Sequence, residues 1–148
     1  MSRWLGIDHG LKRVGLAVGS TEEGFAAPVT VLPAEPEDRL LAEIDRLAGE
    51  YNVAGLVVGW PVNMDDTEGP QARAARAFAA ALAQVTGRDV RLWDERLSSF
   101  HADAALAGHL TRGKRKARQD ALAATAFLDD FLRNDGPARA ARPDAAES

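Results

Sequence analysis

Cysteine is absent from this 148-residue chain. Without thiols there are no disulfides, no thiolate zinc sites and no cysteine nucleophile. Long apolar runs are also lacking, because no segment approaches the ~20 apolar residues that a membrane-spanning helix needs. The start of the chain, Met1 to Trp4, lacks the layout of a signal peptide. We therefore expect a cytoplasmic protein that does not associate with membranes.

An excess of positive charge is also lacking, because 18 Lys and Arg are outnumbered by 22 Asp and Glu and the net charge is −4. This balance argues against a protein coated in positive charge for non-specific nucleic-acid binding. Basic residues are nevertheless dense between Arg112 and Arg118, where five of seven residues are Lys or Arg. Because this stretch follows Thr111 and includes Gly113, we interpret it as a loop. His9, His101 and His109 lack the spacing of metal ligands, and we place the latter two on the surface.

The length and the apolar share of 46% are those of one globular domain. We assign this domain to residues 1–133. Residues 134–148 are rich in Ala, Pro, Arg and Asp, which predicts a disordered tail.

The hydrophobic periodicity predicts an α/β fold with a five-stranded mixed sheet in the order β-β-β-α-β-α-β-α-α, with helices on both faces. Pro28 would suit an edge strand. The expected strands are residues 3–8, 14–18, 25–32, 53–58 and 90–94. The expected helices are residues 36–50, 68–85, 98–110 and 117–132.

Two carboxylates follow predicted strands. Asp8 ends the first strand, at the carboxyl edge where α/β sheets usually place ligands, although a turn aspartate is the plain alternative. Glu95 directly follows the fifth strand. Neighbouring side chains at a strand end point to opposite faces, so either Asp94 or Glu95 could enter a shared site. The alternative for Glu95 is a solvated Asp-Glu-Arg turn, and Asp94 could instead cap the chain or hold Arg96.

Asp120 belongs to the face of the last predicted helix that Ala124, Phe127 and Phe131 complete. A carboxylate on an apolar face costs desolvation energy unless a partner such as a divalent cation compensates it. The alternative is an aspartate near the helix start that interacts with the macrodipole.

Together, Asp8, Glu95 and Asp120 could bind Mg²⁺ or Mn²⁺, which prefer oxygen ligands. Two such ions about 4 Å apart can activate water and stabilise the leaving oxygen of a phosphodiester. Basic residues adjoin each acid, as expected if a polyanion lies across the metals. The candidate nucleic-acid contacts, with Asn63 of the loop after residue 58, are Lys12, Arg13, Asn63, Arg96, Arg112, Lys114, Arg115, Lys116 and Arg118. Trp60 could stack on a base, but a packed core residue is the better interpretation.

Four motifs, in order, resemble the YqgF/RuvX family of Holliday junction resolvase-like proteins, also described as pre-16S rRNA nucleases. They are Gly6-Ile-Asp-His-Gly-Leu-Lys-Arg-Val-Gly-Leu-Ala17, Val58-Gly-Trp-Pro-Val-Asn63, Asp94-Glu-Arg-Leu-Ser-Ser99 and Asp120-Ala-Leu-Ala-Ala124. The resemblance implies a ribonuclease H-like fold and a divalent-metal nuclease site formed by Asp8, Glu95 and Asp120. It also implies a role in processing the 5′ end of precursor 16S rRNA. The chain departs from the family pattern at Gly19-Ser20, where Ser-Asp is usual, and at Asp65-Asp66-Thr67.

Three functions remain as hypotheses. The first is a metal-dependent nuclease acting on structured RNA, with pre-rRNA as the partner. The second is a resolvase of branched DNA, which requires a two-fold homodimer rather than a monomer. The third is a nucleic-acid-binding factor in ribosome maturation without catalytic turnover. An actin-like nucleotide-binding domain is disfavoured because two such domains enclose ATP and this chain has one.

Overall fold

The computed structural model describes residues 2–63, 65, 67–94 and 112–143. Residues 112–121 are described through their backbone alone. The predicted helix over 98–110 lies outside the described residues.

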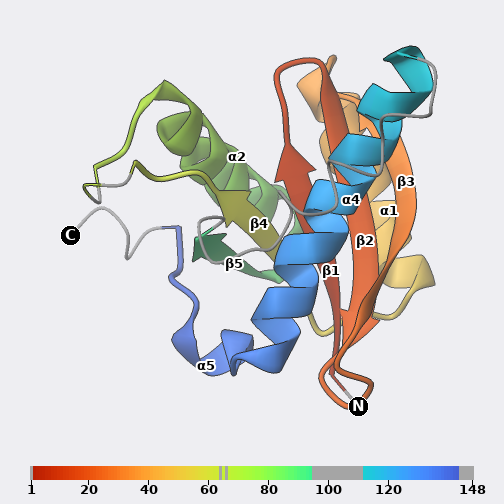
Figure 1. The fold of residues 1–148 in the computed structure, drawn as a ribbon, viewed down its shortest axis with the longest axis vertical. Helices are drawn as coiled ribbons and strands as arrows, with labels where there is room; N and C mark the ends of the chain where they lie inside the picture. Colours follow the sequence, from red (N-terminus) through yellow and green to blue (C-terminus); the bar gives the residue numbers. More distant parts are fainter. Residues whose placement is uncertain (1, 64, 66, 95–111, 144–148) are drawn as a thin grey trace.

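Five strands in the described part of the chain form one mixed sheet in the order β3-β2-β1-β4-β5. The strands are β1 (Arg3–His9), β2 (Arg13–Ser20), β3 (Ala26–Pro33), β4 (Gly55–Trp60) and β5 (Asp89–Asp94). The first three form an antiparallel meander, and β4 and β5 run parallel to β1. The carboxyl ends of β1, β4 and β5 therefore meet at one edge of the sheet, as Figure 1 shows. The mixed sheet predicted from the sequence is confirmed.

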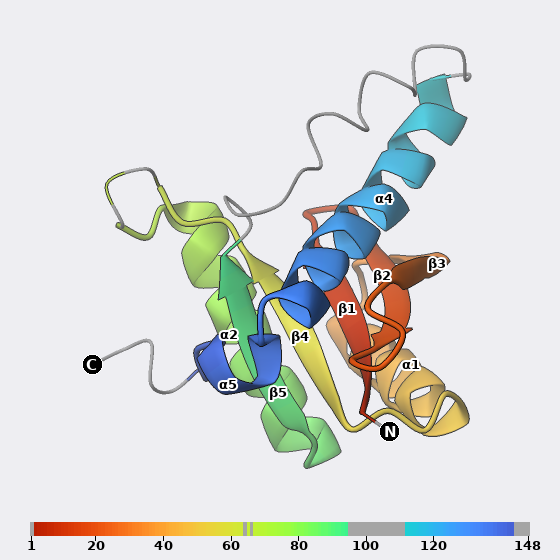
Figure 2. The same cartoon turned by 60° about the horizontal axis from the view of Figure 1, so that its bottom comes forward.

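Helices cover both faces of this sheet (Figure 2). Helices α1 (Glu37–Glu50) and α2 (Pro70–Thr86) pack on one face, and α4 (Arg112–Arg133) packs on the other. Side chains alternate along each strand, so each face has its own apolar core. The helices expected over 36–50 and 68–85 each bury an apolar stripe, formed by Leu40, Leu41, Ile44, Leu47 and Ala48 in α1 and by Phe78 and Leu82 in α2.

Helix α4 crosses β1 at close range because Gly6 has no side chain. A Cβ atom built on Gly6 would lie 2.9 Å from the Cβ of Leu128 and 3.4 Å from the carbonyl oxygen of Ala124. Near the start of β1, the ring of Trp4 packs edge-on against Phe131 with centroids 5.0 Å apart. Trp4 thus contacts Phe131, whereas Gly6, later in β1, lies against the earlier residues Leu128 and Ala124 of α4. The two elements therefore run antiparallel. The first half of α4 therefore lies toward the end of β1 that carries Asp8.

Helix α4 begins at Arg112, so the predicted loop over 112–118 is wrong. Arg, Lys, Ala and Gln lose little side-chain entropy in a helix and are good helix formers. The glycine of this stretch, Gly113, stands in the first turn rather than in the helix interior, where glycine costs most. The basic residues therefore continue the last predicted helix instead of preceding it.

The segment predicted as a disordered tail, 134–148, differs from that prediction as far as Pro143. Helix α5 (Gly136–Arg139) is followed by an isolated bridge to β5. There, Leu92 and Ala141 exchange backbone hydrogen bonds of 2.7 and 3.2 Å. The polar composition alone predicted disorder, whereas these bonds satisfy groups at the outer edge of β5. The remainder of the segment lies outside the described residues.

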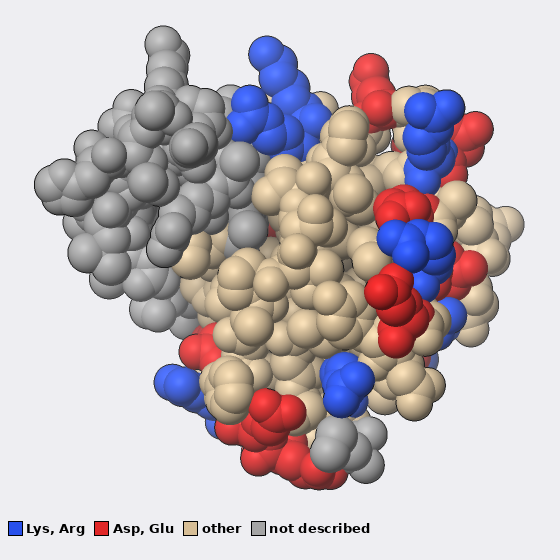
Figure 3. All heavy atoms as spheres, turned by 90° about the vertical axis from the view of Figure 1, so that its right-hand side faces the viewer, with Lys and Arg blue, Asp and Glu red and all other residues tan. Residues whose placement is uncertain are grey.

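The opposite edge of the sheet is β3, as Pro28 predicted. This strand contains no charged residue. Figure 3 shows the uncharged surface around it, with the charged side chains of α1 along one side. In the described part of the chain, no helix has both the length and the apolar character required to cross a bilayer.

Candidate active site

Asp8 lies near the carboxyl end of β1, on the face that α4 covers. The register pairs Ile7 with Val58, and Gly59 with Trp93, so Asp8 and Trp93 stand in the same row of the sheet. Trp93 belongs to the core beneath α4, and alternation from Ile7 directs Asp8 to that same side. The side chain of Asp8 is half-buried, so its carboxylate lies at the boundary of the α4 core.

Asp94 lies on the opposite face. Val90 and Leu92 of β5 belong to the core under α1 and α2, whereas Trp93 belongs to the core under α4. Asp94 follows Trp93 in the alternation and pairs in register with Trp60, which packs against the α1–α2 core. Asp94, the alternative to Glu95 as a metal ligand, is therefore separated from Asp8 by the sheet. Glu95 and Arg96 lie outside the described residues.

Asp120 is an interior residue of α4. Residues 112 to 120 make more than two helical turns at 3.6 residues per turn. Because the macrodipole acts within the first turn, the alternative of an aspartate at the helix start is wrong. One turn later, Ala124 is buried, and Phe127 and Phe131 are buried with it, as predicted. The side chain of Asp120 lies outside the described part of the structure.

The hairpin between β1 and β2 carries two of the predicted nucleic-acid contacts. The amide of Gly10 donates to the carbonyl of Arg13 at 3.0 Å and closes the turn. A Cβ on Gly10 would lie 2.6 Å from that same oxygen, so glycine is required there. Lys12 is exposed and Arg13 is half-buried. The amide of Ala34 donates to the carbonyl of Lys12 at 2.9 Å, which braces the turn against the chain after β3.

The loop that follows β4 is held by a charged clamp that the sequence did not predict. Glu68 accepts a hydrogen bond from the Trp60 indole at 2.9 Å and another from the Arg76 guanidinium at 2.9 Å. The second carboxylate oxygen of Glu68 also lies 2.9 Å from Arg76. The hydrogen bond from Arg76, followed by that from Trp60, lowers the pKa of the Glu68 carboxyl. The sequence does not reveal this clamp, because the chain turns between Glu68 and α2 and no helical or strand periodicity relates Glu68 to Arg76.

Asn63 is exposed in this loop, and its side-chain amide donates a hydrogen bond to the Thr67 hydroxyl at 3.0 Å. The Thr67 hydroxyl and amide in turn bond to the carboxylate of Asp65. These bonds order the loop from within. Trp60 is half-buried and bonded to Glu68, so the interpretation of Trp60 as a packed residue is confirmed.

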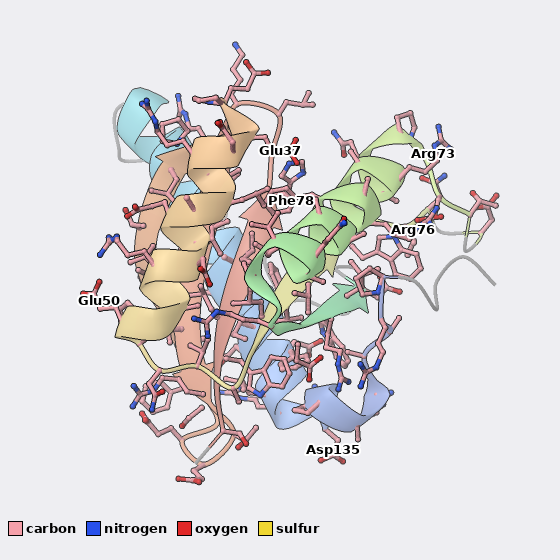
Figure 4. The ribbon with its side chains drawn as sticks, turned by 180° about the vertical axis from the view of Figure 1, so that it is seen from behind. Glu37, Glu50, Arg73, Arg76, Phe78 and Asp135 are labelled. Carbon is pink, nitrogen blue, oxygen red and sulfur yellow. The ribbon has the colours of Figure 1, made fainter. Side chains whose placement is uncertain are left out.

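His9 occupies the α1–α2 side of β1, directly after Asp8. Its ring stacks on Phe78 of α2, with centroids 4.3 Å apart and planes inclined by 17°. Burial lowers the pKa of the His9 imidazole, and the carboxylate of Glu37 partly opposes this effect. Figure 4 labels Phe78 of α2 and Glu37 of α1 at this end of the sheet, and Arg73 and Arg76 closer to the start of α2. His9 therefore fastens the end of β1 to α2.

The structure describes the side chain of one of the three predicted metal ligands, Asp8. Among the described residues, no three His, Asp or Glu side chains lie close enough together to hold a metal ion. The three-carboxylate site stays a prediction, because it needs Glu95 and the side chain of Asp120. The nucleic-acid contacts predicted at the start of α4 also stay predictions, because only the backbone is described there. These residues are Arg112, Lys114, Arg115, Lys116 and Arg118.

Comparison with solved structures identifies the class of fold. The Thermus thermophilus RuvC structure in complex with a Holliday junction substrate superimposes with a TM-score of 0.59, covering 95% of this chain and 99% of that one. A second Thermus thermophilus RuvC structure gives a TM-score of 0.53 over 94% of this chain and 98% of that one. Sequence identities of 16% and 14% make this a likeness of fold. The chain has the RuvC-like ribonuclease H fold.

Sequence comparison then identifies the family. The family model "RuvX: Holliday junction resolvase" matches residues 2–134, and the chain belongs to this RuvX/YqgF family. Relatives named "Putative pre-16S rRNA nuclease" include one from Anaeromyxobacter dehalogenans, 43% identical over 91% of this chain and 99% of its own length. Another, from Opitutus terrae, is 46% identical over 88% of this chain and 90% of its own. The relative from Chloroflexus aggregans is 41% identical, over 86% and 91%.

Proposed function

We propose that this protein is a metal-dependent nuclease that hydrolyses phosphodiester bonds at the 5′ end of precursor 16S rRNA. Asp8, Glu95 and Asp120 would hold Mg²⁺ or Mn²⁺. The observation that carries the proposal is the position of Asp8 at the carboxyl edge of the sheet, on the face covered by α4. The membership of the chain in a nuclease family supports it.

The packing of α4 on β1 explains how Asp120 would reach the same site. Gly6 approaches the turn of α4 at Ala124. From Gly6, two residues of strand lead about 6.7 Å along β1 to Asp8. From Ala124, four residues of helix lead about 6 Å in the same direction to Asp120. The backbones at the two aspartates would thus lie at similar positions along the direction of β1, one in the strand and the other in the helix that faces it.

The donor set fits a hard divalent cation, because carboxylate oxygens are its preferred ligands and the described carboxylate, Asp8, is half-buried. When bound, such a cation supplies a water of lowered pKa and charge compensation for the leaving oxygen. The chain itself sets the position of the carboxylates. The small Gly6 permits the approach of α4, and β1 directs Asp8 toward that helix. Asp94 is directed away.

The nucleic acid would contact the basic residues around this edge. Lys12, exposed at the turn of the β1–β2 hairpin, and Arg13 would bind phosphates, which position the substrate without reading its sequence. Asn63 would contribute from the loop after β4. We assign the same role to Arg96 and to the residues that begin α4, namely Arg112, Lys114, Arg115, Lys116 and Arg118. The reaction would take place in the cytoplasm, where precursor rRNA is found.

The test is cleavage of a precursor 16S rRNA fragment by purified protein with Mn²⁺ or Mg²⁺. We expect Asp8→Asn to lower the rate at least about 100-fold, which corresponds to about 2.7 kcal/mol of transition-state stabilisation. Asp94→Asn is the matched control, because Asp94 ends β5 on the other face, and it should retain activity. An intact RNA, under conditions where a control nuclease cuts it, would overturn the proposal. If cells required the basic residues but tolerated Asp8→Asn, the protein would act by binding alone.

A second candidate is the resolution of four-way DNA junctions, which the description of the matched family favours. Symmetric cutting requires a homodimer. The same preparation should therefore be offered a DNA junction, with light scattering to measure its mass. Cutting of the junction by a dimer, with the RNA left intact, would favour this candidate over the first.

A further inference from the structure

A cavity of about 350 Å³ lies beside Asp8, between the β1–β2 hairpin and the start of α2. Its walls combine the end of β1 and the hairpin with the chain on either side of the loop after β4. The described residues that line it are Asp8, His9, Gly10, Leu11, Pro61, Pro70, Gln71 and Ala74. Its volume is at the lower end of the ~300–1,000 Å³ typical of small-ligand pockets. The cavity therefore has room for one small group such as a nucleobase, and not for a duplex.

We propose that this cavity receives one unpaired nucleobase of the substrate, next to the phosphate that Asp8 serves. This inference rests on the proposed function for the identity of the polymer. The base would contact Leu11 and the two prolines on its faces and Gln71 on its edge.

Leu11 provides the first argument. Its side chain is 81% exposed, more than that of the other exposed large apolar residues described, Val85 at 61% and Phe25 at 52%. The backbone turn that carries it is braced by the hydrogen bonds from Gly10 to Arg13 and from Ala34 to Lys12. Leucine and proline side chains placed in this way contact or wedge unstacked bases in other nucleic-acid-binding proteins. An exposed apolar side chain on a braced turn at the rim of the cavity favours an apolar partner.

The charge of the lining provides the second argument. Of the described residues that line the cavity, none is a lysine or arginine. The neighbouring cavity on the other side of the hairpin is lined by Glu35 and Glu37. Both surfaces disfavour a phosphate group inside the cavity. Lys12, at the exposed turn outside it, suits the phosphates instead, which leaves a base as the part of a nucleotide that enters.

Gln71 provides the third argument. It is exposed in the first turn of α2, at the rim of the cavity. Its amide can donate and accept at once, which matches the paired donor and acceptor on the edge of a base. An unpaired base exposes this edge, whereas a base within a duplex does not. The site therefore selects single-stranded or frayed nucleotides next to the cleavage point.

The experiment measures binding without cleavage. Fluorescence anisotropy, without added divalent cation, compares an RNA hairpin that carries a short single-stranded 5′ extension with the same RNA bearing one abasic nucleotide in that extension. The abasic position is moved along the extension in separate ligands. We expect wild type to bind one of the abasic RNAs at least about fivefold more weakly, because the contacts of one base are lost.

Leu11→Ser and Gln71→Ala should abolish this discrimination. The matched controls Val85→Ser and Gln84→Ala should retain it, because they alter an exposed apolar residue and an exposed glutamine at the far end of α2. Equal binding of all abasic RNAs and the intact RNA by wild type, or full discrimination by Leu11→Ser, would overturn the proposal. Because no step depends on hydrolysis, discrimination by a protein that fails to cleave would refute the nuclease function and leave the base site standing.

Discussion

Gly6 lies so close to Leu128 that a Cβ atom added to the glycine would be 2.9 Å from the Cβ of Leu128. The lack of a side chain at Gly6 sets how closely α4 lies against β1. It thereby sets the distance between the backbones that carry Asp8 and Asp120. Gly6 precedes Asp8 on the same face of β1, and Leu128 lies two turns after Asp120 in α4. The separation of these two proposed ligands thus depends on a glycine that bears no functional group.

Gly6→Ala should therefore reduce both stability and activity. The added methyl group would push α4 away from the sheet, at a cost of about 1–3 kcal/mol of unfolding free energy measured in urea. A displacement of about 1 Å at the ligands can cost roughly 100-fold in rate. Gly49→Ala is the control, because its Cβ would lie 3.6 Å from the Arg88 guanidinium and the residue belongs to helix α1. Unchanged stability and activity in Gly6→Ala would contradict this account of α4.

Glu68→Ala should loosen the loop after β4. The substitution removes the shared acceptor of Trp60 and Arg76, whose side chain is only 18% exposed. We expect a loss of about 1–2 kcal/mol in the free energy of unfolding, because a partly buried guanidinium loses its charged partner. Glu43→Ala, which breaks an exposed pair with Arg46 in α1, should change stability much less. Equal effects of the two substitutions would show that Glu68 is not a structural clamp.

The stability advantage of wild type over Glu68→Gln should depend on pH. Arg76 lowers the pKa of the Glu68 carboxyl in the folded protein below its ordinary value of 4.5. The unfolded chain therefore binds this proton more readily, so the stabilisation is present above the unfolded pKa. It is lost as the pH falls through the folded pKa. Urea unfolding of both proteins between about pH 7 and pH 3 should show their difference shrinking in acid. A constant difference would place the effect of Glu68 elsewhere than in its charge.

Removal of the segment after Asn134 should destabilise the protein, although the sequence predicts a disordered tail there. The truncated chain would lose the two backbone bonds between Leu92 and Ala141. It would also lose the bond from the Arg91 guanidinium to the Pro137 carbonyl. We expect a loss of about 1–3 kcal/mol and increased light scattering, since the outer edge of β5 is uncovered. Truncation after Pro143 is the control. If both truncations behaved like wild type, the segment would have no role in the fold.

The sequence predicted the elements whose residues repeat with a clear period. Helix α1, strand β4 and helix α2 lie within about two residues of the predicted ranges 36–50, 53–58 and 68–85. These patterns are local, because each element buries one face or satisfies one backbone conformation. The register of neighbouring strands is not local. It was the register that separated Asp94 from Asp8, where the sequence had left Asp94 and Glu95 as alternatives.

The sequence failed where long-range contacts decide. Arg91 and Leu92 hold the segment after α4, and nothing in its polar composition reveals those partners. The basic stretch after Thr111 was interpreted by charge density and one glycine, although its residue types are good helix formers. The departure from the family pattern at Gly19 has a similar origin. A Cβ there would lie 2.5 Å from the Phe25 carbonyl oxygen, so this chain packs its turn too closely for a serine.

Calorimetric titration with Mn²⁺ tests most directly whether distant carboxylates share one ion. We predict that wild type binds Mn²⁺ and that Asp8→Asn and Asp120→Asn each weaken binding at least about tenfold, or about 1.4 kcal/mol. Asp94→Asn, on the other face of the sheet, should bind as wild type does. Equal Mn²⁺ affinity in wild type, Asp8→Asn and Asp120→Asn would contradict the proposed metal site.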